Sequence, residues 1–511
     1  MTPPETQSLA LPPAVPRSIA RPAAVPSVAA RSDAHSGTVR DVNWSPATWL
    51  LLVVLCGALF LDALDLSMVG VALPSIGSSL RLAPGSLQWI VSGYILGYGG
   101  LMLLGGRASD LLGRRRVFLA AVAVFGAASV ISALLSNDLA LVALRFVKGA
   151  SAAFTVPAGL SIITTTFAEG PARNRALSIY SVCGASGFSL GLVVGGLLTE
   201  VGWRVTFLVP GPVAIALVLA GLRVIPRGAA ERIRPHHFEL RSFDIPGALT
   251  STAALLILVY AVVDAPNRGW GSPVTIGLLA LSVALTAAFV AIELRHSRPL
   301  VRLGILRSRT LVHANLAAAA MFGGYSAFQF VVTLYVQNSL GWSPLGMALG
   351  FLPAGLLVAL SSTWMEAVLG RVDTAWLIFF GLLALMAGYA LFLRTEPSMA
   401  YADFLLPTML LLGVGFALCF PAVNAQATKG IADHEQGLAS GLLNTSVQIG
   451  GAIMLAVVSA ILSGSGSPSV HHELLPGMTT AIAVSVGVSL FALVLTVVFL
   501  AQGRRRAGAD A

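Results

Sequence analysis

The chain has 511 residues, of which 56% are hydrophobic and 10% are charged, and its mean hydropathy is +0.85. Soluble globular proteins carry about 25% charged residues, so this composition excludes a soluble enzyme or binding domain and predicts an all-α polytopic membrane protein. The formal net charge of +9 does not indicate nucleic acid as a partner, because the sequence has no basic patch interleaved with aromatic residues.

Fourteen apolar runs of roughly 20 residues are long enough to cross a bilayer as helices. In chain order they lie at 48–73, 88–106, 117–135, 138–160, 176–199, 204–222, 245–263, 273–293, 312–335, 345–366, 373–393, 403–423, 437–462 and 479–501.

The segments between these runs carry their basic residues unevenly. Of the 31 Lys and Arg residues, 25 lie on the side of the two termini, and the opposite loops hold only Arg81, Arg204, Arg268 and Arg394. Basic residues mark the cytoplasmic side, so both termini are expected in the cytoplasm. The chain is therefore expected to be a multi-pass protein of the cell membrane with the lipid bilayer as a partner. Its Arg-rich and Ala-rich usage favours a bacterial inner membrane.

The runs are grouped in the order six, two and six. The predicted regions are a disordered cytoplasmic tail (1–46), a six-helix bundle (48–222), a cytoplasmic linker (223–244), two extra central helices (245–293), a second linker (295–311), a second six-helix bundle (312–501) and a basic cytoplasmic tail (502–511). A faintly similar six-residue sequence that begins with Gly and ends with Phe precedes Pro-Ala in the fourth helix of each bundle, at 149–158 and 415–422. Repeated bundles are typical of secondary transporters, which bind substrate near mid-membrane.

Four charged residues lie inside two of the apolar runs. Asp62 and Asp65 are in the first run, and Arg145 and Lys148 are in the fourth. Each pair is spaced i, i+3, which places both members on the same side of a helix. A charge at the bilayer centre costs at least about 2.5–3.5 kcal/mol, so such residues usually face the protein interior and mark a transport pathway.

The loop after the second run reads Gly-Arg-Ala-Ser-Asp-Leu-Leu-Gly-Arg-Arg-Arg. Glycines permit a tight turn, and a single acid among arginines is suited to latching neighbouring helices together. The candidate latch residues are Gly106, Arg107, Asp110, Gly113, Arg114 and Arg115, and an ordinary positive-inside hairpin is the alternative.

This loop resembles the conserved loop of the major facilitator superfamily. More narrowly, the chain resembles the fourteen-span drug:proton antiporter branch of EmrB/QacA type, in residues 64–74, 88–89, 144–149, 203–204, 334–337 and 437–444. The resemblance implies that this loop is a cytoplasmic gate, in which Asp110 latches the first bundle to the start of the thirteenth span while the transporter faces outward. It implies that Asp65 couples protons or binds cationic drug, and that Arg145 faces the cavity and takes part in proton exchange.

The fifth run carries glycines suited to close helix packing, Gly187, Gly191, Gly195 and Gly196. They resemble the antiporter-associated glycine motif, except that Leu192 replaces the proline that follows the second glycine. Without that proline kink, the motif supports antiport less strongly and a plain packing stripe remains an alternative.

Two of the buried charges depart from the family pattern. Lys148 stands where the family usually has glutamine, and it either balances a helix-one acid, attracts an anionic or zwitterionic substrate, or adjusts the ionisation of Asp65. Asp62 has no family counterpart and is either a second proton carrier or the direct partner of Lys148.

The second bundle supplies aromatic and amide side chains suited to poorly specified apolar ligands. The candidate cavity residues are Tyr325, Phe328, Gln329, Phe420, Asn424, Asn444 and Gln448.

The sequence predicts a monomeric proton-driven exporter of hydrophobic small molecules. The alternatives are a proton-coupled symporter for a nutrient and, more remotely, an intramembrane enzyme. It has no phosphate-binding Gly-x-x-x-x-Gly-Lys motif. Its three cysteines are spaced for neither a metal nor a disulfide. Its eight histidines fall in loops or at the ends of runs. No metal, cofactor or catalytic residue is therefore expected.

Overall fold

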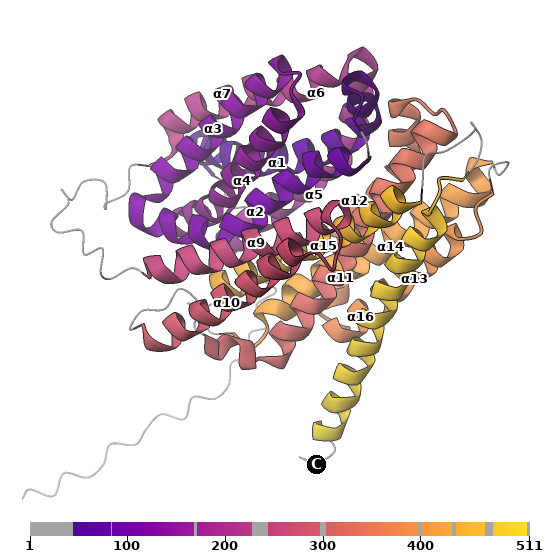
Figure 1. Cartoon of the computed structure of the whole chain (residues 1–511). Coiled ribbons are helices and arrows are strands. Elements are labelled where there is room, and N and C mark those ends of the chain that lie inside the picture. Colours follow the sequence, from indigo (N-terminus) through magenta and orange to yellow (C-terminus); the bar gives the residue numbers. More distant parts are fainter. Residues whose placement is uncertain are drawn as a thin grey trace, which may run out of the picture. The chain divides into compact units, whose positions relative to one another are not determined.

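The computed structural model describes residues 44–82, 84–167, 171–226, 244–296, 303–396, 400–431, 436–465 and 474–507. All regular secondary structure in this part of the chain is helical (Figure 1). Residues Trp44–Ala511 form one compact unit. Residues 1–43 of the predicted tail, 227–243 of the first linker, 297–302 of the second linker and 508–511 of the basic tail fall outside the described residues, so the predicted regions stay untested.

The helices follow the predicted runs in order. The first group is α1 (Pro46–Leu80), α2 (Pro84–Leu112), α3 (Arg114–Leu134), α4 (Asp138–Thr166), α5 (Pro171–Val201), α6 (Trp203–Leu208) and α7 (Pro210–Val224). The central pair is α9 (Ile245–Arg268) and α10 (Pro273–Arg295). The last group is α11 (Arg309–Leu334) with the short turns η2 (Leu303–Arg307) and η3 (Tyr335–Ser339) at its ends, followed by α12 (Pro344–Leu369), α13 (Thr374–Phe392), α14 (Tyr401–Thr428), α15 (Gln436–Gly464) and α16 (Met478–Ala507).

Twelve helical segments of the described residues are long and apolar enough to cross a membrane. The helices α2 and α9 are not among these twelve, and the apolar part of α9 is the shorter segment Pro246–Val262. The prediction of helices at all fourteen runs is confirmed, whereas the number of spans remains a prediction.

Local sequence explains where several helices begin. The side chains of Ser45, Asp244 and Ser272 each accept a hydrogen bond from the backbone three residues ahead, and each is followed by proline in the first turn of its helix. Such caps satisfy backbone N–H groups that the helix leaves unpaired. In the sixth run, the break at Val209 precedes Pro210 and divides the run into α6 and α7.

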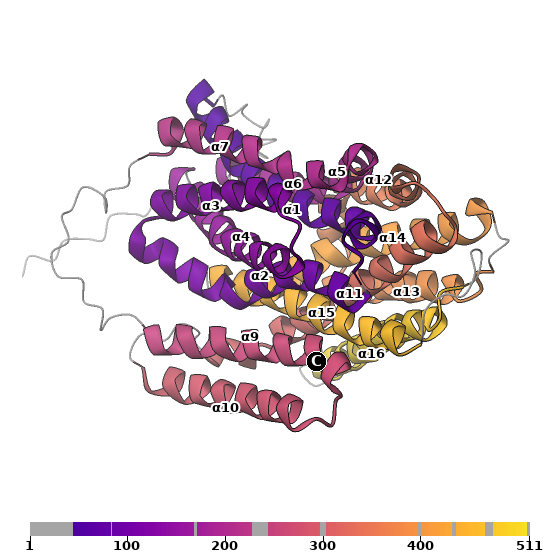
Figure 2. The same cartoon turned by 45° about the horizontal axis from the view of Figure 1, so that its top comes forward.

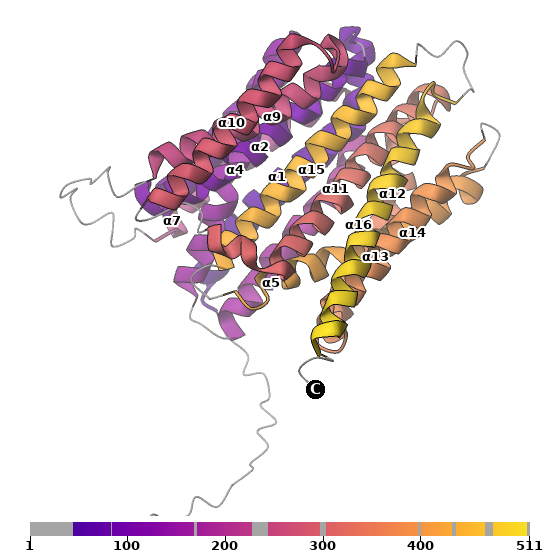
Figure 3. The same cartoon turned by 60° about the horizontal axis from the view of Figure 1, so that its bottom comes forward.

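The two helix groups meet along two pairs of helices. The helix α2 packs against α15, and α5 packs against α12 (Figure 2). The central helix α9 lies against both α2 and α15, and α10 packs mainly against α9, on the outer side of that junction (Figure 3). The added pair therefore covers one seam between the groups and leaves the helices α1, α4 and α5 in contact with one another.

Candidate functional site

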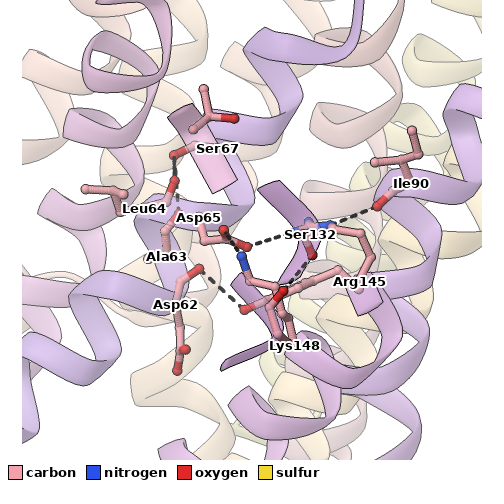
Figure 4. A network of polar contacts seen from close by, with 12 residues as sticks. Asp62, Ala63, Leu64, Asp65, Ser67, Ile90, Ser132, Arg145 and Lys148 are labelled. Carbon is pink, nitrogen blue, oxygen red and sulfur yellow. Dashed lines mark hydrogen bonds and ion pairs between the residues drawn. The ribbon is translucent and has the colours of Figure 1, made fainter. Parts of the chain in front are cut away.

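The centre of the first helix group contains an ion cluster built on Asp65. One carboxylate oxygen of Asp65, on α1, accepts from Arg145, and the other accepts from Lys148, both on α4 (Figure 4). All three side chains are fully buried. Arg145 and Lys148 lie on the same side of α4, as the i, i+3 spacing predicts, and both contact the same acid.

Arg145 is held by groups from α2 as well as by Asp65. Its Nε donates to the carbonyl oxygen of Ile90 at 3.0 Å, and its guanidinium lies 4.6 Å from the centre of the Tyr94 ring. A planar guanidinium can use its edge for hydrogen bonds and its face for an aromatic ring at the same time. These contacts fix Arg145 between α1 and α2.

Lys148 is surrounded by aromatic rings from two further helices. Its Nζ lies 4.7 Å from the Phe125 ring centre, on α3, and 5.5 Å from the Phe207 ring centre, on α6. Aromatic faces attract a cation that has lost its water. Neither phenylalanine nor Tyr94 was singled out from the sequence, because aromatic residues inside apolar runs look like ordinary core residues.

Asp62 is buried, with 6% of its surface exposed, but it does not join these ion pairs. Its Oδ2 has no hydrogen-bond partner among the described residues. Its side chain points away from Asp65, whereas its main-chain oxygen accepts from the Tyr94 hydroxyl at 3.4 Å (Figure 4). Because Lys148 pairs with Asp65, the interpretation of Asp62 as the direct partner of Lys148 is wrong. Side chains on a helix lean toward its N-terminus, so the Asp62 carboxyl lies nearer the N-terminus of α1 and out of reach of Lys148.

A cavity lies between the two helix groups, with an empty volume of about 480 Å³ including the open space at its mouth. Its lining is mainly apolar and comes from α1, α2, α5, α11 and α15: Leu66, Gly70, Leu73, Val91, Ile95, Phe188, Phe322, Ser326, Gln329, Phe330, Thr333 and Leu455. Apolar lining with few polar groups suits small hydrophobic molecules. None of the charged cluster residues is in this lining. The resemblance placed Arg145 at the cavity, but here its side chain is buried inside the first helix group.

Of the seven candidate cavity residues, Gln329 lines this cavity. Phe328 is fully buried against Tyr389 and Phe392 in the core of the second group. The remaining candidates have other surroundings. Tyr325 packs edge-on against Phe416, and Gln448 packs beside Gly99. The Phe420 side chain is 42% exposed. The amides of Asn424 and Asn444 donate to carbonyls of their own helices.

Comparison with known proteins settles the family. The Major Facilitator Superfamily sequence pattern matches residues 55–455. The chain belongs to this superfamily. It is 36% identical over 475 residues to the puromycin resistance protein pur8 of Streptomyces alboniger, covering 89% of this chain and 92% of that protein. It is 36% identical over 470 residues to the cephamycin export protein CmcT of Amycolatopsis lactamdurans, covering 90% and 94%.

Solved structures show the same fold at low identity. The POT family transporter PepTSo gives a TM-score of 0.65 at 14% identity, covering 89% of this chain and 98% of that chain. Membership of the superfamily makes the chain a transporter rather than an enzyme, and a multi-pass protein of the cell membrane.

The glycines of α5 bring that helix of the transporter very close to α1. A Cβ at Gly187 would lie 2.5 Å from the Phe60 carbonyl oxygen, one at Gly191 would overlap Ser67 Oγ, and one at Gly195 would lie 2.6 Å from Met68 Cα. Gly196 instead faces α12, 2.9 Å from Leu345 Cα. These glycines thus pack α5 against α1 and α12.

Three faces of α1 therefore have three different neighbours. Residues 60, 64 and 68 meet the glycines of α5, and Leu66, Gly70 and Leu73 line the cavity. Asp65 points to the cations of α4. Each set follows the helical repeat of three or four residues. A displacement of α1 changes the cavity and the ion cluster together.

The predicted gate loop is described only in part. The side chain of Asp110 and residues 432–435, ahead of α15, fall outside the described residues, so the latch stays a prediction. Gly113 has φ +90°, a left-handed conformation that allows the sharp turn between α2 and α3. Arg115 Nη2 donates to the Leu222 carbonyl oxygen at 2.6 Å, at the end of α7. Gly106 faces Pro157 of α4, whereas Arg107 and Arg114 are half-buried.

A second buried polar cluster, in the last helix group, was not found from the sequence. His313 was expected at the end of a run, but it is buried in α11 between Gln426 of α14 and Thr496 of α16. Gln426 also accepts from Thr374 of α13 at 3.1 Å. The sequence signal for this cluster is weak, because its members are single polar residues on four separate runs.

Proposed function

We propose that this transporter exports hydrophobic or amphipathic small molecules, such as drugs, toxins or natural products, in exchange for protons. The observation that carries the proposal is a buried, titratable ion cluster on the same helix that lines an apolar cavity. The names of the relatives add support, since they describe puromycin resistance and cephamycin export.

The expected arrangement in the membrane completes this proposal. Fourteen spans, with α2 and α9 among them, place both termini in the cytoplasm, as the distribution of basic residues favours. Two six-helix bundles then flank the central pair α9–α10. The protein acts as a monomer whose partners are the bilayer, protons and a hydrophobic substrate, and it requires no cofactor or metal.

Alternating access supplies the mechanism. Rocking of the two helix groups about the seams α2–α15 and α5–α12 opens the cavity to one side and then to the other. The cluster of Asp62, Asp65, Arg145 and Lys148 couples this movement to proton binding, because α1 forms part of both the cavity wall and the cluster. The proton gradient provides about 2.3 kcal/mol per charge for each 100 mV of membrane potential.

The loop between α2 and α3 is proposed as the cytoplasmic gate. Asp110 latches the first bundle to the start of α15 while the cavity faces outward. The ordered turn at Gly113 and the bond from Arg115 to Leu222 hold the loop against α7, which supports a fixed position for the latch.

A susceptibility assay tests export directly. The gene is expressed in a bacterial strain that lacks its own drug pumps, and growth is measured against puromycin with and without an uncoupler. We expect resistance that the uncoupler abolishes, and loss of resistance in Asp65→Asn at an equal level of protein in the membrane. Increased uptake of puromycin would favour symport, and uncoupler-insensitive resistance would contradict proton coupling.

A further inference from the structure

The ion cluster gives its two acids unequal surroundings. Each oxygen of Asp65 contacts a different buried cation. A proton on Asp65 would leave Arg145 and Lys148 close together without an anion, and an unpaired buried charge costs several kcal/mol. Asp65 is therefore stabilised in its ionised form as long as α1 and α4 stay in place.

Asp62 lacks such a partner. Its Oδ2 is buried and makes no hydrogen bond within the described residues. The nearby Tyr94 hydroxyl donates to the main-chain oxygen of Asp62. A buried carboxylate without a partner lowers its free energy by taking up a proton and becoming neutral. Of the two acids, Asp62 is the one whose surroundings favour the neutral form.

The titratable and charged groups around Asp62 lie on α1 itself and on α2, α4 and α5. They are Cys56 and Asp65 on α1, Tyr94 and Tyr98 on α2, Arg145 and Lys148 on α4, and Tyr180 and Cys183 on α5. Asp65, Arg145 and Lys148 together carry one net positive charge. Ionised Asp62 neutralises the cluster, and protonated Asp62 leaves it at plus one.

We propose that Asp62 carries the coupling proton, while Asp65 remains ionised and acts as a positioning residue that holds α1 against α4. This inference rests on the proposed function and assigns the proton within it. The proton bonds to a carboxyl oxygen of Asp62 when the cavity faces outward, and it returns to cytoplasmic water when the cavity faces inward. Each cycle therefore switches the charge of the cluster between zero and plus one.

The cluster charge gives this switch a direct effect on α1. An extra positive charge inside the first helix group changes the electrostatic free energy of every arrangement of α1 against α4. The cavity residues Leu66 and Gly70 are on the same helix, so the proton on Asp62 alters the cavity without touching the substrate. Coupling in this form needs no direct contact between substrate and charge.

Infrared spectroscopy tests proton binding without any substrate. The pH-dependent difference spectrum of the purified transporter in lipid nanodiscs is recorded for wild type, Asp62→Asn and Asp264→Asn. Asp264 is the matched control, because it pairs with Arg268 near the end of α9. We expect the carbonyl band of a protonated carboxylic acid in wild type and in Asp264→Asn, and its loss in Asp62→Asn. Persistence of the band in folded Asp62→Asn would overturn the proposal.

Transport in proteoliposomes, with puromycin as the probe, tests the consequence. Asp62→Asn is expected to exchange puromycin down its gradient but to lose proton-driven accumulation, and Asp62→Glu is expected to restore it. Full accumulation by Asp62→Asn would contradict the inference. If wild type shows no proton-driven transport, the proposed function fails, whereas the infrared result still decides whether Asp62 binds the proton.

Discussion

The two helix groups bury polar side chains in different ways. The first group encloses charges, with Asp65 bonded to Arg145 and Lys148. The last group encloses a neutral cluster. Gln426 Nε2 lies 2.6 Å from His313 Nδ1, and Thr496 Oγ1, which donates to the Ala492 carbonyl, lies 2.9 Å from His313 Nε2. With the amide nitrogen donating to Nδ1, the ring carries its one proton on Nε2, and His313 is neutral.

Buried polar side chains therefore have different roles in the two helix groups. The neutral cluster satisfies both ring nitrogens of His313 and ties α11, α13, α14 and α16 together. Fully satisfied networks of this kind make a core more rigid. The Oδ2 atom of the neighbouring Asp62 has no hydrogen-bond partner in the part of the chain that the structure describes, so the charge of Asp62 can change. We infer that the first group contains the moving, proton-sensitive part and that the last group is the stable frame.

The largest effect is expected from Asp65→Asn, which removes the anion shared by two buried cations. Loss of one partner from a buried ion pair costs about 3–5 kcal/mol, so the free energy of unfolding falls and export is lost. Thermal unfolding followed by size-exclusion chromatography measures the change. Asp373→Asn is the matched control, since Asp373 lies 3.5 Å from Lys429 in an exposed pair. An exposed pair contributes only about 0–1 kcal/mol. Equal melting temperatures of the two variants would contradict the account.

A smaller effect is expected from Gly191→Ala, which separates α5 from α1. The new Cβ would overlap Ser67 Oγ and the backbone of Leu64. Overpacking typically costs about 1–3 kcal/mol, and here it also shifts the helix that carries Asp65. We expect lower thermal stability and reduced export. Gly277→Ala, on α10, has open space around its Cβ and should leave both unchanged. Tolerance of Gly191→Ala would show that the α1–α5 contact is looser than described.

A substitution in the neutral cluster should lower stability without changing proton coupling. His313→Leu removes the contacts of the ring with Gln426 and Thr496, which keep their bonds to Thr374 and Ala492, at about 0.5–1.5 kcal/mol for each hydrogen bond lost. We expect a lower melting temperature but an unchanged number of protons moved per puromycin. A change in that number would place part of the coupling in the last helix group and remove the distinction between the two.

The smallest effect is expected from Gln329→Leu at the cavity. Only the amide of this lining residue is lost, which corresponds to about 0.5–1.5 kcal/mol of binding free energy. The apparent KM for puromycin should change by up to about tenfold, without a change in stability. Gln502→Leu, at the exposed end of α16, serves as the control. An unaltered KM for several compounds would indicate that substrates bind elsewhere.

Particular residues show which parts of the fold and of the candidate site could be predicted from the sequence. The apolar runs located the helices with ends within seven residues, because a bilayer imposes length and hydropathy on each span, but they did not show the break between α6 and α7. The i, i+3 spacing predicted that Arg145 and Lys148 lie on the same side of α4. It did not decide between Asp62 and Asp65, since that depends on side-chain direction. The aromatic rings around Lys148 and the partners of His313 could not be predicted, because long-range contacts between apolar runs leave no local pattern.

The central claim is that charge in the first helix group couples protons to transport, whereas the neutral cluster of the last group does not. It is tested most directly by puromycin-dependent proton flux into proteoliposomes containing Asp62→Asn or His313→Leu, at equal protein content. The account predicts loss of this flux in Asp62→Asn and a preserved ratio of protons to puromycin in His313→Leu. Preserved flux in Asp62→Asn, or loss of coupling in His313→Leu, would contradict it.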